Sequence, residues 1–294
     1  MKIYELHKRR TSPILLSLVI GMLAGTGGCA KVKLDTSFSA SVGTKPKKNK
    51  KAKPAPKEPK APQPTTDELL TAAVDGDHRT EENKARGKYR HPIKTLEFFG
   101  LQPEMTVVEI NGAPGWYTEI LAPVLAERGQ LFVTTDDPEG NPKDPRTQIA
   151  QEFAATLKAS EALAQVKTVV VKDGEFKIAP DESVDLVVSF RNSHIWWRGK
   201  TEADIMGAVF NALKPGGRFL IVDHAAAAGT GKDSAQAVHR IEEAFARVAV
   251  ERYGLRYKGA SDALRNTADN YQVTAFDPSV QGKTDRFILV FEKP

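Results

Sequence analysis

The chain has 294 residues, enough for one domain of moderate size with extensions, and its single cysteine, Cys29, excludes an intramolecular disulfide and a structural zinc site built on several cysteines. The formal charge of +5 is unevenly placed, because residues 1–66 carry 14 Lys and Arg against 3 Asp and Glu, whereas residues 67–294 carry 28 against 34. The basic character therefore belongs to the N-terminal part and is no argument for nucleic-acid binding by the folded part.

Residues 1–29 have the three-part layout of a secretory signal. Four basic residues precede a short apolar stretch at residues 14–24, and small residues then lead to Cys29. At about a dozen residues, the apolar stretch is shorter than the roughly 20 residues that a helix needs to span a bilayer.

The segment also resembles a bacterial lipoprotein signal, although Thr26 stands where such signals usually have leucine. The resemblance implies that Cys29 is lipidated and anchors the chain to the membrane on the periplasmic side of the cell envelope. The alternatives are an ordinary signal peptide or an uncleaved anchor with an incidental cysteine. An unprocessed signal would leave the domain on the cytoplasmic face.

Residues 30–66 are rich in Lys and Pro and almost free of large apolar side chains. Such a composition cannot offset the entropy lost on ordering, so we expect a disordered spacer. In a second interpretation its lysines lie on anionic lipid or an envelope polymer, each contributing up to about 1 kcal/mol.

A folded domain is predicted over residues 67–294, beginning with helices. Residues 67–100 have helical spacing, with Pro92 suited to the first turn of a helix and Gly100 to its C-terminal cap. We expect this part to cover one edge of a sheet.

Residues 106–123 predict a strand, a tight turn and a helix. Val107 and Val108 favour a strand that ends at an acidic residue, Glu109, and helical spacing begins at Thr118. The turn between them contains Gly112, Pro114 and Gly115. Such a turn lets a ligand approach the backbone closely, and the acid can accept hydrogen bonds from it.

Four further strands are predicted at residues 130–135, 166–171, 184–190 and 218–222, alternating with helices at residues 147–164 and 202–213. Continuous apolar strands that alternate with helices indicate a parallel sheet covered on both faces. Ligands bind such sheets beyond the carboxyl ends of the strands. Each predicted strand ends there in polar residues: Glu109; Asp136 and Asp137; Asp173; Arg191, Asn192 and His194; Asp223 and His224.

The sequence resembles the class I S-adenosylmethionine-dependent methyltransferases, and within them a bacterial group of predicted methyltransferases. The resemblance covers roughly residues 70–294 and rests on Gly-Trp-Tyr-Thr-Glu-Ile-Leu-Ala-Pro (115–123), Phe-Arg-Asn-Ser-His-Ile-Trp (190–196), Leu-Lys-Pro-Gly-Gly (213–217), Val-Asp-His (222–224), Leu-Arg-Asn-Thr-Ala-Asp (264–269) and Asp-Arg-Phe-Ile-Leu-Val-Phe-Glu-Lys-Pro (285–294). It implies an α/β, Rossmann-like, mostly parallel seven-stranded sheet, with an antiparallel last strand at residues 286–292 beside a sixth strand near residues 255–258.

The resemblance also implies a binding site for S-adenosyl-L-methionine. Glu109 and the turn from Gly112 to Gly115, with Tyr117 and Thr118 after it, would hold the methionine end. Asp136 or Asp137 would accept the ribose hydroxyls, Asp173 would lie near the adenine amino group, and Asn192 near the carboxylate or the sulfonium. The chain departs from the family's glycine pattern at Asn111 and Ala113, but Asn tolerates positive φ and Ala is small, so we expect the turn to survive.

Histidines at strand ends are the candidates for acid–base chemistry, because imidazole titrates near neutral pH. We predict His194 as the base, with His224, Asp223 and Arg191 on the substrate side. The alternative is that these residues pair with each other and with loop backbone. A metal site from His194, His224 and Asp223 has acceptable ligand types, but nothing in the spacing requires one, so we expect none.

The three tryptophans lie beside the same strand ends. Trp116 and Trp196 could stack on adenine or face a sulfonium, or pack in the core, and Trp197 is expected in the core.

Two functions follow from the sequence. The first is a methyltransferase acting on a small or envelope-associated molecule. The second is an exported binding protein that keeps the fold and the pocket without catalysis. An exported domain would be separated from a cofactor that is made inside the cell, so the first function requires that the cofactor arrives by an unidentified route or that the N-terminus stays inside.

Overall fold

The computed structural model describes residues 63–172 and 175–294, which belong to one compact unit, Lys60–Pro294. The predicted signal, Cys29, most of the predicted spacer and Asp173 lie outside the described residues. Within them, no helix has the length and apolar character needed to cross a membrane.

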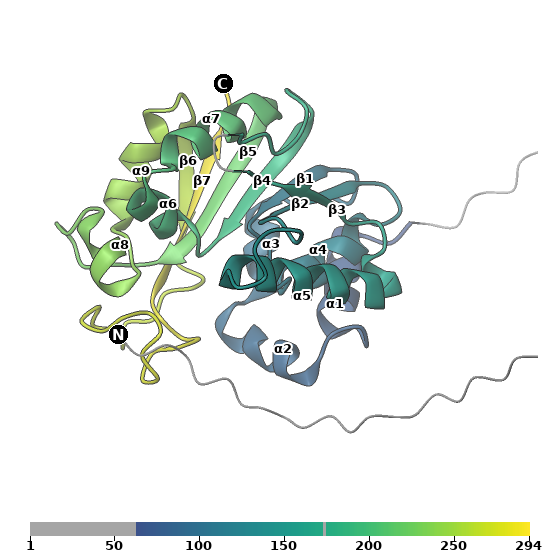
Figure 1. Ribbon diagram of the computed structural model, residues 1–294, viewed down its shortest axis with the longest axis horizontal. Helices are drawn as coiled ribbons and strands as arrows, with labels where there is room; N and C mark the ends of the chain where they lie inside the picture. Colours follow the sequence, from purple (N-terminus) through teal and green to yellow (C-terminus); the bar gives the residue numbers. More distant parts are fainter. Residues whose placement is uncertain (1–62, 173–174) are drawn as a thin grey trace, which may run out of the picture. The chain divides into compact units, whose positions relative to one another are not determined.

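The described residues form a seven-stranded sheet in the order β3-β2-β1-β4-β5-β7-β6 (Figure 1). Strands β1 to β5 pair in parallel, and β7 is antiparallel to both of its neighbours, β5 and β6. The strands are β1 (Thr106–Ile110), β2 (Gln130–Thr135), β3 (Lys167–Val170), β4 (Val184–Phe190), β5 (Leu213–His224), β6 (Arg256–Ser261) and β7 (Arg286–Glu292). This arrangement confirms the predicted fold class, including the antiparallel last strand.

Helices cover both faces of the sheet (Figure 1). Because successive strand residues point to opposite faces, Val107 packs in one apolar cluster and Val108 in the other. The first cluster includes residues of α1 (Thr66–Asp75), α3 (Pro92–Phe98), α4 (Thr118–Leu125) and α5 (Pro145–Ala159), and the second those of α6 (Ser193–Gly199), α7 (Glu202–Ala212) and α9 (Glu243–Glu251). Shorter helices are α2 (Glu81–Ala85), η1 (Arg86–Tyr89), η2 (Glu161–Leu163) and α8 (Asp233–Val238).

Two expectations about the edges of the sheet were wrong. The helices of residues 67–100 lie on a face, where Leu70 and Leu96 are fully buried in the first cluster, and they do not cover an edge. One edge of the sheet is β3, which pairs with β2 alone among the described strands and has mostly exposed side chains. The prediction that the strands are covered on both faces is therefore confirmed for the central strands and wrong for β3.

The segment after α7 also differs from the prediction. Residues 214–217 were expected to form a loop, but β5 begins directly at Leu213, which pairs with Val184 of β4. Asn192 begins a short helix, α6, where the sequence suggested only a polar strand end. The prediction of Pro92 in a first helical turn and Gly100 just after the helix is confirmed, with Gly100 at φ 70°.

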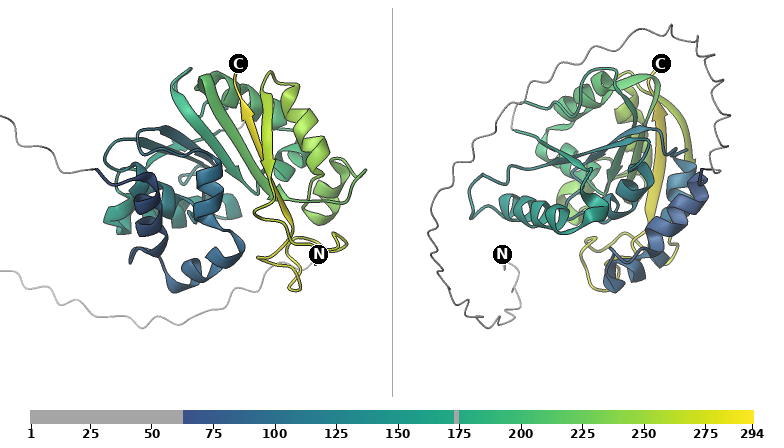
Figure 2. Two further views of the ribbon diagram at one scale, coloured as in Figure 1. Left: turned by 180° about the vertical axis from the view of Figure 1, so that it is seen from behind. Right: turned by 90° about the vertical axis from the view of Figure 1, so that its right-hand side faces the viewer.

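Two segments far apart in sequence lie side by side near the carboxyl ends of the strands (Figure 2). One is the N-terminal segment around Tyr89 and His91. The other is the irregular loop of residues 262–285, which precedes β7. The Nη1 of Arg286 donates to the carbonyl oxygen of Tyr89 at 3.0 Å and joins the two segments.

Candidate functional site

A cavity of about 180 Å³ lies at the carboxyl ends of β1 and β4, where the strand order changes direction. This is the position at which α/β sheets bind ligands. It is lined by the turn after β1, by the end of β4 with the start of α6, and by single residues from other segments: Arg86, Glu109, Asn111, Gly112, Ala113, Pro114, Trp116, Tyr117, Phe190, Arg191, Asn192, His194, Ile195, His224 and Phe276.

The turn after β1 survives its two missing glycines. Asn111 adopts φ 48°, which Asn tolerates, and its backbone N–H donates to Thr134 Oγ1 at 2.8 Å. Gly115 has φ 95°. A side chain at Gly112 would lie 2.6 Å from Val133 Cγ1 and 2.8 Å from the Glu109 carboxyl carbon, so only glycine fits there. The sequence prediction for this turn is confirmed.

Glu109 is a buried carboxyl group at the floor of the cavity. It is 3 % exposed and accepts a hydrogen bond of 2.6 Å from Thr118 Oγ1. Burial raises the pKa of Glu109 to about 8, and the Thr118 bond and the charge of Arg191 only partly oppose that rise. Glu109 is therefore mostly protonated at neutral pH.

Asp223 is fully buried and collects four donors. Ser193 Oγ donates to it at 2.5 Å, the backbone N–H groups of His194 and His224 donate at 2.9 and 2.7 Å, and His194 Nδ1 lies 2.9 Å from its Oδ1. Burial alone would raise the pKa of Asp223, but the attraction of His194 and these hydrogen bonds hold it well below its usual range. An ionised carboxylate only accepts, so Nδ1 of His194 carries a proton and donates it to Asp223.

His224 stands beside this pair, with its ring centroid 5.9 Å from that of His194. Its Nδ1 is hydrogen-bonded to Thr284 Oγ1 at 2.7 Å. Burial lowers the pKa of His224 well below 6.5, and the cations Arg286 and Arg191 add to that effect against the attraction of Asp223. His224 is therefore neutral at physiological pH.

Three of the predicted cofactor residues have side chains already engaged in the protein. Tyr117 stacks on Phe190 with ring centroids 3.5 Å apart and planes inclined by 7°. Thr118 bonds Glu109, and Asn192 Nδ2 donates to the carbonyl oxygen of Ile110 at 3.0 Å. Tyr117 and Asn192 still line the cavity, but their contacts also hold the strand ends together.

Asp136 and Asp137 lie in a second hollow, of about 230 Å³, at the carboxyl end of β2. Lys172, Asn141 and Thr147 also line it. The structure thus brings predicted residues from β1, β4 and β5 together around one cavity, although Asp223 is fully buried and does not line it, and keeps those from β2 in a separate hollow. Asp173 lies outside the described residues.

The tryptophans divide between the site and the core. Trp116 lines the cavity, and the guanidinium groups of Arg79 and Arg90 lie 4.9 Å and 4.3 Å from its ring centroid. Trp196 and Trp197 belong to α6 and are buried in the second apolar cluster, so the core position expected for Trp197 is confirmed. In the part of the chain that the structure describes, no group of three His, Cys, Asp or Glu is arranged to hold a metal ion.

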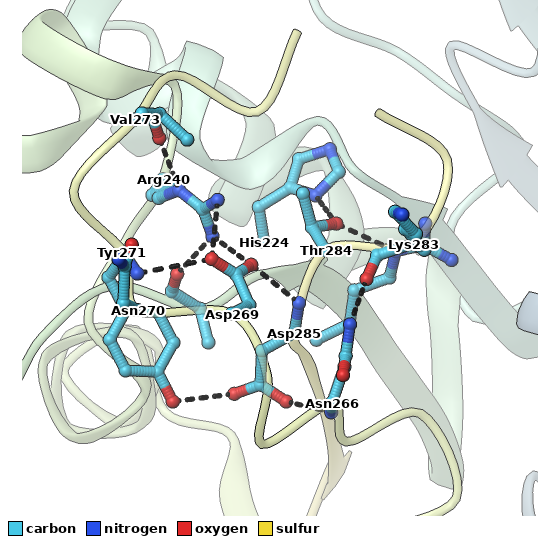
Figure 3. Close-up of polar contacts among 12 residues, drawn as sticks. His224, Arg240, Asn266, Asp269, Asn270, Tyr271, Val273, Lys283, Thr284 and Asp285 are labelled. Carbon is cyan, nitrogen blue, oxygen red and sulfur yellow. Dashed lines mark hydrogen bonds and ion pairs between the residues drawn. The ribbon is translucent and has the colours of Figure 1, made fainter. Parts of the chain in front are cut away.

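The loop of residues 262–285 borders the cavity through Phe276 and is fixed by a buried ion pair (Figure 3). Arg240 donates from Nη1 and Nη2 to the carboxylate of Asp269 at 2.9 and 3.1 Å, and both side chains are fully buried. The same carboxylate accepts the backbone N–H of Asp285 at 2.8 Å. Thr284, the partner of His224, follows in the same loop, so this network positions one wall of the site.

A wider hollow of about 540 Å³ lies on the other side of this loop. Its polar groups bind one another: Arg265 pairs with Glu243 and Asp285, and the hydroxyl group of Tyr271 donates to Asp285 at 3.0 Å. Because these groups satisfy each other, the smaller cavity is the better candidate site.

Sequence reasoning missed the residues that reach the cavity from distant segments. Arg86 and Phe276 line it, and Arg90 lies behind Trp116. The only sequence feature that links Arg86 with Arg90 is their spacing of one helical turn, which would place both on the same side of a helix. Nothing near Phe276 in the sequence indicated that its loop returns to this edge of the sheet.

Comparison with known proteins gives no family model that matches the chain and no matching curated protein. Solved structures do match. A SAM-dependent methyltransferase from Aquifex aeolicus has TM-score 0.50 at 16 % identity, over 70 % of this chain and 92 % of its own. A geranyl diphosphate C-methyltransferase from Streptomyces coelicolor A3(2) has TM-score 0.51 at 12 % identity, over 76 % and 89 %. The [4+2]-cyclase SpnF has TM-score 0.50 at 15 % identity, over 79 % and 98 %. At such low identity the likeness establishes the fold alone: the chain has the Rossmann-like fold of the class I S-adenosylmethionine-dependent methyltransferases.

Proposed function

We propose that the protein is an S-adenosyl-L-methionine-dependent methyltransferase that acts on a small or envelope-associated acceptor, with His194 as the base. The observation that carries the proposal is the His194–Asp223 pair, in which His194 lines the cavity next to the Glu109 turn and the fully buried Asp223 holds its ring. Such a pair, at the ligand-binding edge of a methyltransferase fold, suits removal of a proton from a hydroxyl or amine.

The residues at this edge fit the cofactor in kind. Glu109 is an acid beside a tight turn, the cavity admits a ligand next to that turn, and Asp136 and Asp137 supply carboxylates at the end of the next strand. When bound, the cofactor supplies a methyl group on a sulfonium, which is open to in-line displacement. The protein has to hold the two reactants in line and keep water out.

His194 would take the proton of the acceptor at Nε2. Asp223 fixes the ring through Nδ1 and stabilises the positive charge that develops on it. Ser193 and the backbone N–H groups of His194 and His224 keep the Asp223 carboxylate in place. His224, which is neutral, would then line the acceptor site as an uncharged polar side chain.

Specific observations favour a second candidate, a binding protein that keeps the fold without catalysis. Asn111 and Ala113 replace two glycines of the family's turn, and the cavity is smaller than the roughly 300–1,000 Å³ usual for ligand pockets.

Calorimetric titration of the full-length chain with S-adenosylmethionine and S-adenosylhomocysteine separates the two candidates. Micromolar binding, about −8 kcal/mol, supports the enzyme, whereas absence of heat and of a thermal shift supports the binding protein. With an acceptor in hand, His194→Gln should lose most turnover and the exposed His91→Asn should not. If the His194→Gln variant kept full turnover, His194 could not be the base.

For location, we propose an envelope lipoprotein anchored through Cys29, with residues 30–66 as a basic spacer beside the membrane and no nucleic-acid partner. The order of basic, apolar and small residues before Cys29 supports this proposal. Incorporation of a palmitate analogue should be lost in Cys29→Ala, and unchanged labelling would contradict it.

A further inference from the structure

One side of the cavity is unusually rich in arginine. Arg86 and Arg191 line the cavity, and Arg90 and Arg286 lie behind it, close enough for their charges to act on one another. Within residues 63–172 and 175–294, none of the four forms an ion pair with a carboxylate.

The hydrogen bonds of these arginines leave donors unused. Arg90 is 3 % exposed, and its Nη1 is buried with no hydrogen-bond partner among the described residues. The side chain of Arg191 has no hydrogen bond there either, and its backbone sits at φ 62°, a strained conformation for a long side chain. Arg86 donates only to Asn83 Oδ1, at 3.1 Å. Arg286 alone is well satisfied, by two carbonyl groups and the Thr284 hydroxyl.

The electrostatic state of the arginines agrees with this geometry. Burial, together with the charges of the neighbouring arginines, lowers the pKa of Arg90 to about 8 and that of Arg286 to about 10. The two acids within reach do not compensate, because Glu109 is protonated and Asp223 is held by His194. Arg90 and Arg286 are buried and Arg86 and Arg191 are partly buried, and like charges gathered in such a place are costly unless a ligand brings the opposite charge.

The cofactor does not bring that charge. S-adenosylmethionine carries a sulfonium, an ammonium and one carboxylate, which is a net charge of +1. Bound alone beside four arginines it would add to the repulsion. A negative charge has to come with the other reactant.

We propose that the methyl acceptor carries a carboxylate or a similar small oxyanion, bound by Arg191 and Arg86 while His194 faces its reacting group. The guanidinium fork matches a carboxylate with two parallel hydrogen bonds, and a cavity of about 180 Å³ takes an anionic head group of this size. The proposal rests on the proposed methyltransferase function and names its substrate class. It also requires that the anion and the cationic cofactor strengthen each other's binding.

The test uses acetate as the probe, titrated by calorimetry into the full-length chain in a buffer without other carboxylates, with and without saturating S-adenosylmethionine. The wild-type protein should bind acetate saturably and more tightly when the cofactor is present. Arg191→Gln should weaken acetate binding at least tenfold, or about 1.4 kcal/mol. Arg191→Lys should lie between them, because it keeps the charge and loses the fork.

Arg128→Gln is the matched control, since Arg128 pairs with Glu104 away from the cavity, and it should bind acetate like the wild type. Absence of saturable acetate binding, or equal binding by Arg191→Gln, overturns the inference. So does competition between acetate and S-adenosylhomocysteine, because the arginines would then hold the cofactor's own carboxylate. If the protein binds neither S-adenosylmethionine nor S-adenosylhomocysteine, the proposed function is wrong. Acetate binding that depends on Arg191 would then still show an anion-binding site.

Discussion

Glu109 allows a sharp test that does not depend on any ligand. Its ordinary pKa is 4.5 and its pKa in the folded protein is about 8, so the unfolded chain ionises first as the pH rises. The stabilisation from the protonated group is complete below about pH 4.5 and is lost as the pH rises through 8. Within that window, a rise of one pH unit lowers the free energy of unfolding by about 1.4 kcal/mol. Over the whole range from pH 4.5 to 8 the loss is up to about 5 kcal/mol.

The perturbation is Glu109→Gln, which keeps the shape and an oxygen for the Thr118 hydroxyl but cannot ionise. Unfolding in denaturant at pH 5, 6, 7, 8 and 9 should show the wild type losing about 2.7 kcal/mol relative to the variant between pH 5 and 7. Glu104→Gln, which removes an exposed carboxylate, is the control. A constant difference between wild type and Glu109→Gln from pH 5 to 8 would refute the reasoning, because it would mean that Glu109 is ionised in the folded protein.

Other predictions concern the same cavity and its walls. A cationic cofactor beside Glu109 favours the ionised carboxylate, so its binding at pH 7 should release protons, measured by calorimetry in buffers of different ionisation enthalpy. Asp269→Asn leaves a buried guanidinium without its partner and should cost about 3–5 kcal/mol in denaturant unfolding, whereas Asp262→Asn, at the exposed end of the same loop, should cost less than about 1 kcal/mol. Gly112→Ala forces a methyl group against Val133 and should cost about 1–3 kcal/mol, whereas Gly207→Ala, in the open middle of α7, should stabilise by about 0.5–1 kcal/mol.

Most of the fold could be predicted because its signals are local. Apolar runs such as residues 184–190 mark the central strands, and the turn at Gly112 and Gly115 marks the passage from strand to helix. β3 was misjudged because it was taken as an apolar strand, although two of its four residues are Lys167 and Thr168 and it lies at the edge of the sheet. Residues 214–217 were misjudged because a Pro-Gly-Gly sequence favours a turn, while the pairing of β5 with β4 already begins at Leu213.

The site could be predicted only in part, for a related reason. Glu109, Arg191, His194 and His224 follow strands, and parallel strands bring their carboxyl ends to one edge. Their states could not be predicted, because the pKa of Glu109 depends on burial and the tautomer of His194 depends on Asp223. The arginines come from segments whose position is set by tertiary packing, and their spacing does not reveal it.

The position of β7 has a consequence for the order in which the chain can fold during synthesis. β7 lies between β5 and β6 and is the only strand partner of β6 among the described residues. Residues 256–261 therefore remain unpaired, and the open edge of β5 stays exposed, until residues 286–292 have left the ribosome. The edge of β5 thus stays unpaired while residues 225–285 are being made, and an unpaired strand edge is a target for chaperones and for aggregation.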